Sequence, residues 1–266
     1  MRTILTVRTY PWAKELVCAY KGDASDFNVG DKVVLETEFG TQIATIEVLQ
    51  AMADELISTH IAYIERGASE EDTRLSESLN TNTQHYVESA QKKAKEYELE
   101  MKMVTAVFSL DGYHLTITFI APQRVDFRDL VRELTATFKK SIRFHQIGVR
   151  DEAKLNPAAQ LGTCGQELCC RRFLKTLGNV NADMAKTQDV MHRGADRLTG
   201  QCGRLKCCLR YEQDVYEQLS TTMPAIGGIM ETKHGKGEIV NWHVLRQTVD
   251  VRIAETGAVM EVPFKK

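Results

Sequence analysis

The sequence has no run of 18 consecutive apolar residues, and it therefore predicts no transmembrane helix. Its first 20 residues carry positive charges at Arg2, Arg8 and Lys14 and lack the long apolar segment of a secretion signal. Neither sign of charge dominates, because the net charge is only −2 over 266 residues. With 43% hydrophobic residues, this composition excludes a largely disordered chain and indicates a cytosolic, globular protein of about two or three compact units.

Hydrophobic periodicity and turn signals divide the chain into four segments of an α+β protein. Residues 1–50 alternate apolar and polar side chains and predict a small β unit. Residues 51–155 predict a helix capped by Ser69 and broken near Asn80, a hairpin turning at Asp111-Gly112, a second helix and a strand. Residues 156–220 predict an irregular, cysteine-rich metal-binding segment, and residues 221–266 predict a second small β unit that is barrel-like.

Cysteine is unevenly distributed, since six of the seven cysteines lie between Cys164 and Cys208. They form two copies of the motif CGxxxCC, 38 residues apart, and each copy is followed by an arginine at the same position. The motif cysteines are Cys164, Cys169, Cys170, Cys202, Cys207 and Cys208. Without a secretion signal, such a cluster favours metal binding or redox chemistry over disulfides. The seventh cysteine, Cys18, is expected to be an inert buried thiol.

Each copy of the motif has the chemistry of an incomplete metal site. The glycine after the first cysteine allows backbone N–H groups to approach a sulfur, and nearby arginines stabilise thiolates over thiols. Adjacent cysteines tend to point apart, so one copy offers two or three ligands and a four-thiolate site needs both copies. Ligand softness favours a [4Fe–4S] cluster, and zinc is the alternative because the spacing from Cys164 to Cys169 is compatible with it.

Other chemistries are less favoured by the same residues. Disulfide pairing disagrees with the repeat and the expected compartment. A nucleophilic cysteine or a thiol oxidoreductase has no support from spacing, because no histidine is tied to any cysteine. His192 lies between the two copies and could ligate a metal, but an exposed loop position is the simpler interpretation. The turn His234-Gly235-Lys236-Gly237 lacks the spacing of a phosphate-binding loop.

The segment 164–210 is basic, with nine Lys or Arg against four acidic residues, whereas the remainder of the chain has a net charge of −7. This charge could contact RNA or an acidic protein surface, or it could balance thiolates and a cluster without any partner. Phe173 is the only aromatic residue near the basic side chains before Tyr211, which argues against a platform for base stacking in this segment.

Five motifs extend the pattern beyond the cysteines. They are RVDFRDLV from Arg124, QIGVRDEAK from Gln146, CGQELCC from Cys164, MAKTQ from Met184 and CGRLKCCLRYE from Cys202. On these motifs the chain closely resembles the bacterial RicT (YaaT) family of PSP-type stage-zero sporulation regulators, from about residue 30 to the C-terminus. Gln166 stands where that family usually has arginine.

The resemblance implies a non-enzymatic adaptor that works with RicA- and RicF-like proteins in a complex carrying [4Fe–4S] clusters. It implies a link to mRNA processing by RNase Y and, in spore formers, to the phosphorelay that controls sporulation, competence and biofilm formation. It also implies that the six motif cysteines are the cluster ligands. A zinc-organised RNA-binding module that uses the basic segment 164–210 is the alternative function.

Overall fold

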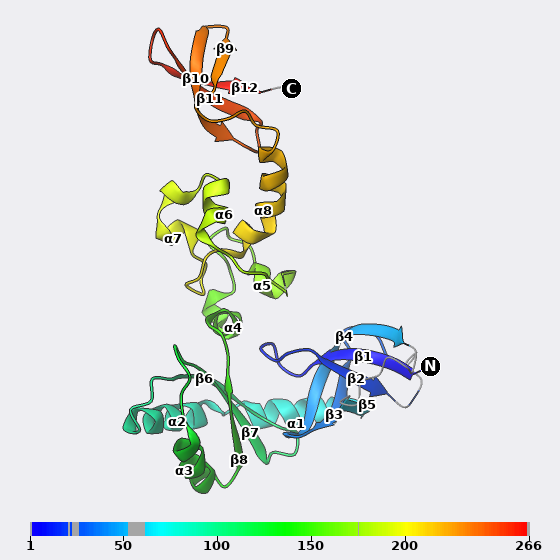
Figure 1. The fold of residues 1–266 in the computed structure, drawn as a ribbon. Coiled ribbons are helices and arrows are strands. Elements are labelled where there is room, and N and C mark those ends of the chain that lie inside the picture. The colour runs from blue at the N-terminus through cyan, green and yellow to red at the C-terminus, as the bar shows by residue number, and fades with distance from the viewer. Residues whose placement is uncertain (1, 21, 23–26, 53–61, 175, 265–266) are drawn as a thin grey trace. The chain divides into compact units, whose positions relative to one another are not determined.

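The computed structural model describes residues 2–20, 22, 27–52, 62–174 and 176–264 (Figure 1). The chain separates into two compact units, Met1–Leu155 and Asn156–Lys266. Both units combine helices with β-sheets, as expected for an α+β protein. None of the described helices is long and apolar enough to cross a membrane.

The N-terminal unit begins with a closed five-stranded barrel. Its strands are β1 (Arg2–Arg8), β2 (Leu16–Tyr20), β3 (Lys32–Thr37), β4 (Gly40–Met52) and β5 (Ala62–Gly67), in the order β1-β2-β5-β3-β4. Alternate residues such as Leu5 and Val7 are buried inside, as the period of two in the sequence predicts. The barrel extends past residue 50, because β5 pairs in parallel with β2 and antiparallel with β3. Cys18 is fully buried in this core, as expected.

A three-stranded sheet with helices on one face completes the N-terminal unit. The sheet consists of β6 (Lys102–Phe108), β7 (His114–Ile120) and β8 (Ser141–Gln146), with β7 in the centre. Helices α1 (Glu70–Asn80), α2 (Gln84–Glu96) and α3 (Arg128–Phe138) precede and interrupt it, and α4 (Val149–Leu155) follows. Buried side chains of α2 and α3 share one core with alternate residues of the strands (Figure 1). The other residues of β7 and β8, including Arg143 and His145, therefore face away from these helices.

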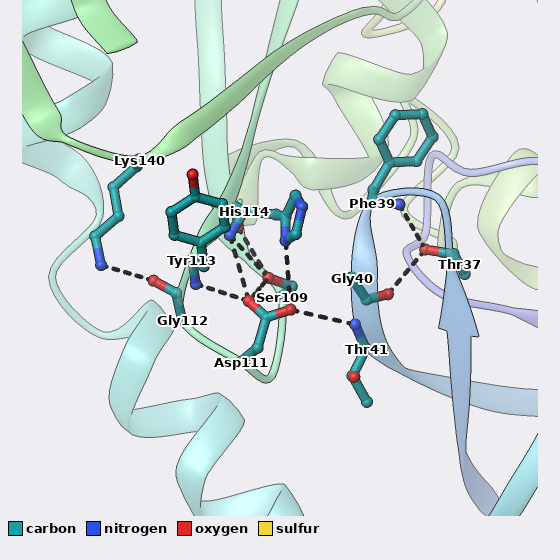
Figure 2. A network of polar contacts seen from close by, with 10 residues as sticks. All are labelled: Thr37, Phe39, Gly40, Thr41, Ser109, Asp111, Gly112, Tyr113, His114 and Lys140. Atoms are coloured by element: carbon teal, nitrogen blue, oxygen red, sulfur yellow. Dashed lines mark hydrogen bonds and ion pairs between the residues drawn. The ribbon is translucent and has the colours of Figure 1, made fainter. Parts of the chain in front are cut away.

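Local signals for the central helices and hairpin are confirmed. Ser69 caps α1 and forms a capping box with Asp72, and the helical pattern breaks after Asn80. The hairpin turns at Asp111 and joins the barrel, because Leu110 N donates to Thr41 O over 2.7 Å. Figure 2 shows the side chain of Asp111 accepting hydrogen bonds around this joint.

The C-terminal unit starts with short helices and ends in a sheet. Its helical elements are η3 (Pro157–Ala159), α5 (Cys169–Arg172), α6 (Ala182–Thr187), η4 (Met191–Arg193), α7 (Ala195–Leu198) and α8 (Cys207–Ser220). The strands are β9 (Ile229–Thr232), β10 (Gly235–His243), β11 (Thr248–Ile253) and β12 (Val259–Pro263). Among the described residues β9 and β12 each pair with one neighbour, so the segment expected to be barrel-like is an open antiparallel sheet.

Candidate metal centre

Both CGxxxCC copies fold into the same tight loop. In the first copy Gly162 N donates to Gln166 O over 2.8 Å, and in the second Gly200 N donates to Arg204 O over 2.8 Å. An isolated β-bridge closes each loop, between Leu161 and Glu167 and at the equivalent positions of the second copy. Since every backbone contact recurs 38 residues later, the sequence repeat is also a structural repeat.

Glycine is required at two positions of each loop. Gly165 and Gly203 follow the first cysteines with φ of 76° and 71°, a left-handed conformation that other residues rarely adopt. Gly162 lies beside the first sulfur, because a Cβ built on it would stand 3.4 Å from Cys164 Sγ. The loop therefore wraps its own backbone closely around the first cysteine, as the glycine after that cysteine predicts.

The cysteine pairs begin helices in both copies. Cys169 and Cys170 start the short α5, while Cys207 and Cys208 occupy the first two positions of α8, a helix of 14 residues. No side chain caps the N-terminus of α8, so its first N–H groups have no capping partner within the element. Such a helix start stabilises an anionic ligand set in its vicinity.

The two copies meet at equivalent residues. Phe173 and Tyr211, which occupy the same position in the repeat, pack edge to face with ring centroids 5.2 Å apart. Burial raises the pKa of Cys208, and the neighbouring Glu212 and Cys169 raise it further, while Lys206 opposes the shift. A cysteine of the first copy is thus close enough to a cysteine of the second to influence its ionisation.

The six motif cysteines are accessible, since Cys164 is exposed and the other five are half-buried. They are not gathered into a finished site: within the described part of the chain, no three Cys, His, Asp or Glu side chains lie close enough to hold a metal ion. A tetrahedral thiolate site needs sulfurs within about 4 Å of one another. The donor chemistry fits a thiolate-bound metal, whereas the ligand geometry remains open.

The residues around the cysteines are basic and solvent-exposed. Arg171, Arg172 and Arg204 are exposed, and Arg171 lies 3.6 Å from Glu167. His192 is exposed, as expected, with its Nδ1 3.9 Å from Asp189 Oδ1. Lys175, one of the basic residues counted in the sequence, lies outside the described residues. The basic segment therefore presents its charge to solvent beside the motif loops.

A small core holds α6 against the start of α8. Ala185 and Leu198 pack with Leu209, and Gln188 is buried with its Nε2 donating to Leu209 O over 2.6 Å. Sequence reasoning identified the cysteines but missed the glycines two residues before each copy and the aromatic contact between copies. Both signals are readable, because Gly162/Gly200 and Phe173/Tyr211 recur at the same offset.

Two family models match parts of this chain. Residues 62–147 match the PSP1 C-terminal conserved region, and residues 179–223 match the third domain of PSP1-like proteins. The second match includes the complete second motif copy. The chain is also similar to the stage 0 sporulation protein YaaT of Bacillus subtilis (strain 168), with 33% identity over 235 residues, or 88% of this chain and 84% of that protein. No solved structure matches it.

Proposed function

Because the chain belongs to the PSP1-type family that includes the stage 0 sporulation protein YaaT, we propose that it is a non-enzymatic regulatory protein whose motif cysteines bind a [4Fe–4S] cluster. The observation that carries the proposal is the duplicated loop, which presents three cysteines in the same backbone setting twice. Contact between Phe173 and Tyr211 supports ligands drawn from both copies. The name of the relative supports a regulatory role connected with sporulation.

The open arrangement of the thiols suits assembly of the site on binding. Metal binding displaces protons from thiols and couples to local folding, so ligands that stand apart without metal can converge when it binds. Ligands can also come from another chain. We propose that RicA- and RicF-like proteins complete the complex in the cytosol, and that the complex modulates mRNA processing by RNase Y. In spore formers it would act on the phosphorelay for sporulation, competence and biofilm formation.

Metal analysis of anaerobically purified protein tests the cluster. We expect iron and labile sulfide in equal amounts and an EPR signal after reduction, with the protein alone or mixed with RicA- and RicF-like partners. Cys164→Ser and Cys202→Ser, one in each copy, should both lower the iron content. Cys18→Ala is the matched control, since Cys18 lies in the barrel core and should leave it unchanged. A colourless protein without iron and sulfide, even with the partners present, refutes the proposal.

A zinc-organised RNA-binding module is the second candidate, favoured by the exposed Arg171, Arg172 and Arg204 beside the motif loops. It requires one equivalent of zinc in the purified protein. It also requires RNA binding that weakens with salt and is lost when these three arginines are replaced by glutamate. RNA binding that survives the triple replacement argues against this candidate.

A further inference from the structure

The N-terminal unit contains a cavity that the cysteine motifs do not explain. Its volume is about 700 Å³, within the usual range for pockets that hold small ligands. It lies where the end of the barrel meets the helix-free face of the three-stranded sheet, and it is lined by residues of both. Mouths of β-barrels are common places for ligand sites.

Aromatic rings form one wall of this cavity. Tyr10 and Trp12 follow β1 and stack with ring centroids 4.8 Å apart and planes 12° apart. Trp12 also lies 4.9 Å from the ring of His145 on β8. All three rings are only half-buried and line the cavity. A row of flat, partly exposed rings favours a ligand that is itself flat and aromatic.

The polar groups beside this wall are held in defined ionisation states. The guanidinium of Arg143 lies 3.5 Å from the ring centre of Phe39, and its Nη2 is 3.4 Å from His145 Nδ1. Burial lowers the pKa of His145, and Arg143 and Lys14 lower it further. His145 is therefore neutral at pH 7, and because Arg143 can only donate, the free proton donor is Nε2. Burial also raises the pKa of Tyr10 to about 12, which keeps its hydroxyl a donor.

A buried amide lies at the barrel end of the cavity. Gln42 is only 6% exposed and lies on the same face of β4 as the core residues Ala44 and Ile46. Its side chain lines the cavity, and no described residue forms a hydrogen bond with it. A buried amide without a partner is costly, so a ligand edge that both donates and accepts would stabilise this end.

The charges around the cavity nearly cancel. Lys14 and Arg143 are opposed by Glu36 and Glu38, all four being lining residues. The cavity is therefore no simple anion trap, and stacking together with hydrogen bonding must select the ligand. Glutamine amides read the edges of nucleobases by paired hydrogen bonds, and aromatic side chains stack on their faces.

From this combination we propose that the cavity binds one nucleobase, stacked on the Tyr10–Trp12 wall with its edge hydrogen-bonded to Gln42. Either a free nucleotide or an unpaired nucleotide of an RNA strand carries such a base. Lys14 and Arg143 then lie near the sugar and phosphate side. This site is separate from the basic segment around the cysteines.

Calorimetric titration of the full chain with the four ribonucleoside monophosphates, and with oligoribonucleotides of about six residues, tests the proposal. We expect binding of at least one base, weakened about ten-fold or more by Gln42→Ala and by Trp12→Ala. Gln84→Ala, an exposed glutamine on α2, should change nothing. Tighter binding of the oligomer than of its monophosphate identifies RNA as the source, and equal binding identifies the free nucleotide.

Absence of binding to every nucleotide and oligomer overturns the proposal, as does binding that neither Gln42→Ala nor Trp12→Ala weakens. Circular dichroism shows whether the variants are folded. Trp12 lies outside the barrel core, so Trp12→Ala keeps the test decisive even if Gln42→Ala unfolds.

Discussion

Asp111 joins the barrel to the central hairpin, and its replacement by asparagine should loosen this joint (Figure 2). Its carboxylate accepts hydrogen bonds from Ser109 Oγ over 2.6 Å and from the N–H of Tyr113 over 2.7 Å, and it reaches Thr41 N on the barrel at 3.4 Å. Although burial acts to raise it, these hydrogen bonds lower the pKa of Asp111 to about 2.

The pKa shift sets the size of the effect. A fall from 3.8 to about 2 corresponds to about 2.4 kcal/mol at 1.36 kcal/mol per pKa unit. Because the side chain is 34% exposed, solvent screening reduces this to about 1–1.5 kcal/mol. For a depressed carboxyl pKa the stabilisation is fully present above about pH 4 and is lost as the pH falls through about 2.

Urea unfolding followed by Trp12 fluorescence, in a Trp242→Phe background, measures this effect in the N-terminal unit. We expect Asp111→Asn to lower the free energy of unfolding by about 1–1.5 kcal/mol at pH 7, with the difference shrinking steadily between pH 4 and pH 3. Asp129→Asn, an exposed carboxylate on α3, is the control and should change stability by less than about 0.5 kcal/mol. Equal losses in the two variants, or a loss for Asp111→Asn that stays constant down to pH 3, would refute the reasoning.

Gly40 offers an independent check of the same joint. It has a φ of 84°, and a Cβ at this position would overlap Asp111 Oδ2 and stand 2.6 Å from His114 Nδ1. Gly40→Ala should therefore destabilise the N-terminal unit, and the double variant with Asp111→Asn should lose less than the sum of the two single losses. Strict additivity would show that the two residues do not share one joint.

Two further predictions concern buried groups. Burial raises the pKa of Cys18 to about 11, so a thiol reagent at pH 8 should label the motif cysteines of the metal-free native protein but reach Cys18 only in urea, as mass spectrometry can show. Gln188→Ala should lower the stability of the C-terminal unit by about 1–3 kcal/mol in urea unfolding followed by Trp242, because it leaves Leu209 O without its side-chain donor. Gln201→Ala, at an exposed position, is the control and should have little effect.

Local features of the fold could be predicted because neighbouring residues determine them. The capping box at Ser69 and the hairpin at Asp111 need only a few consecutive residues, and the structure has both. Closure of the N-terminal barrel was missed, because the parallel pairing of β5 with β2 is a long-range contact without a local pattern. The start of α8 at Cys207 was also missed, since the apolar periodicity becomes readable only near Tyr211.

The two candidate sites differ in the same way. The motif cysteines are readable as a repeat, yet the convergence of their sulfurs depends on tertiary packing that spacing does not encode. The nucleobase cavity gave no signal at all, because Tyr10, Gln42 and His145 are scattered over more than half the chain. Only the folding of the barrel end onto the sheet brings them to one cavity.

The contact between Phe173 and Tyr211 has the form of an isologous interface, in which a residue of one subunit touches the same residue of its twin. Here both twins belong to one polypeptide, as they would after fusion of the two genes of a homodimer. A true homodimer must carry every mutation in both halves, whereas a fused pair can change one half alone. Gln166 opposite Arg204 and Glu167 opposite Leu205 are such changes, so the two halves of this chain are free to recognise different partners.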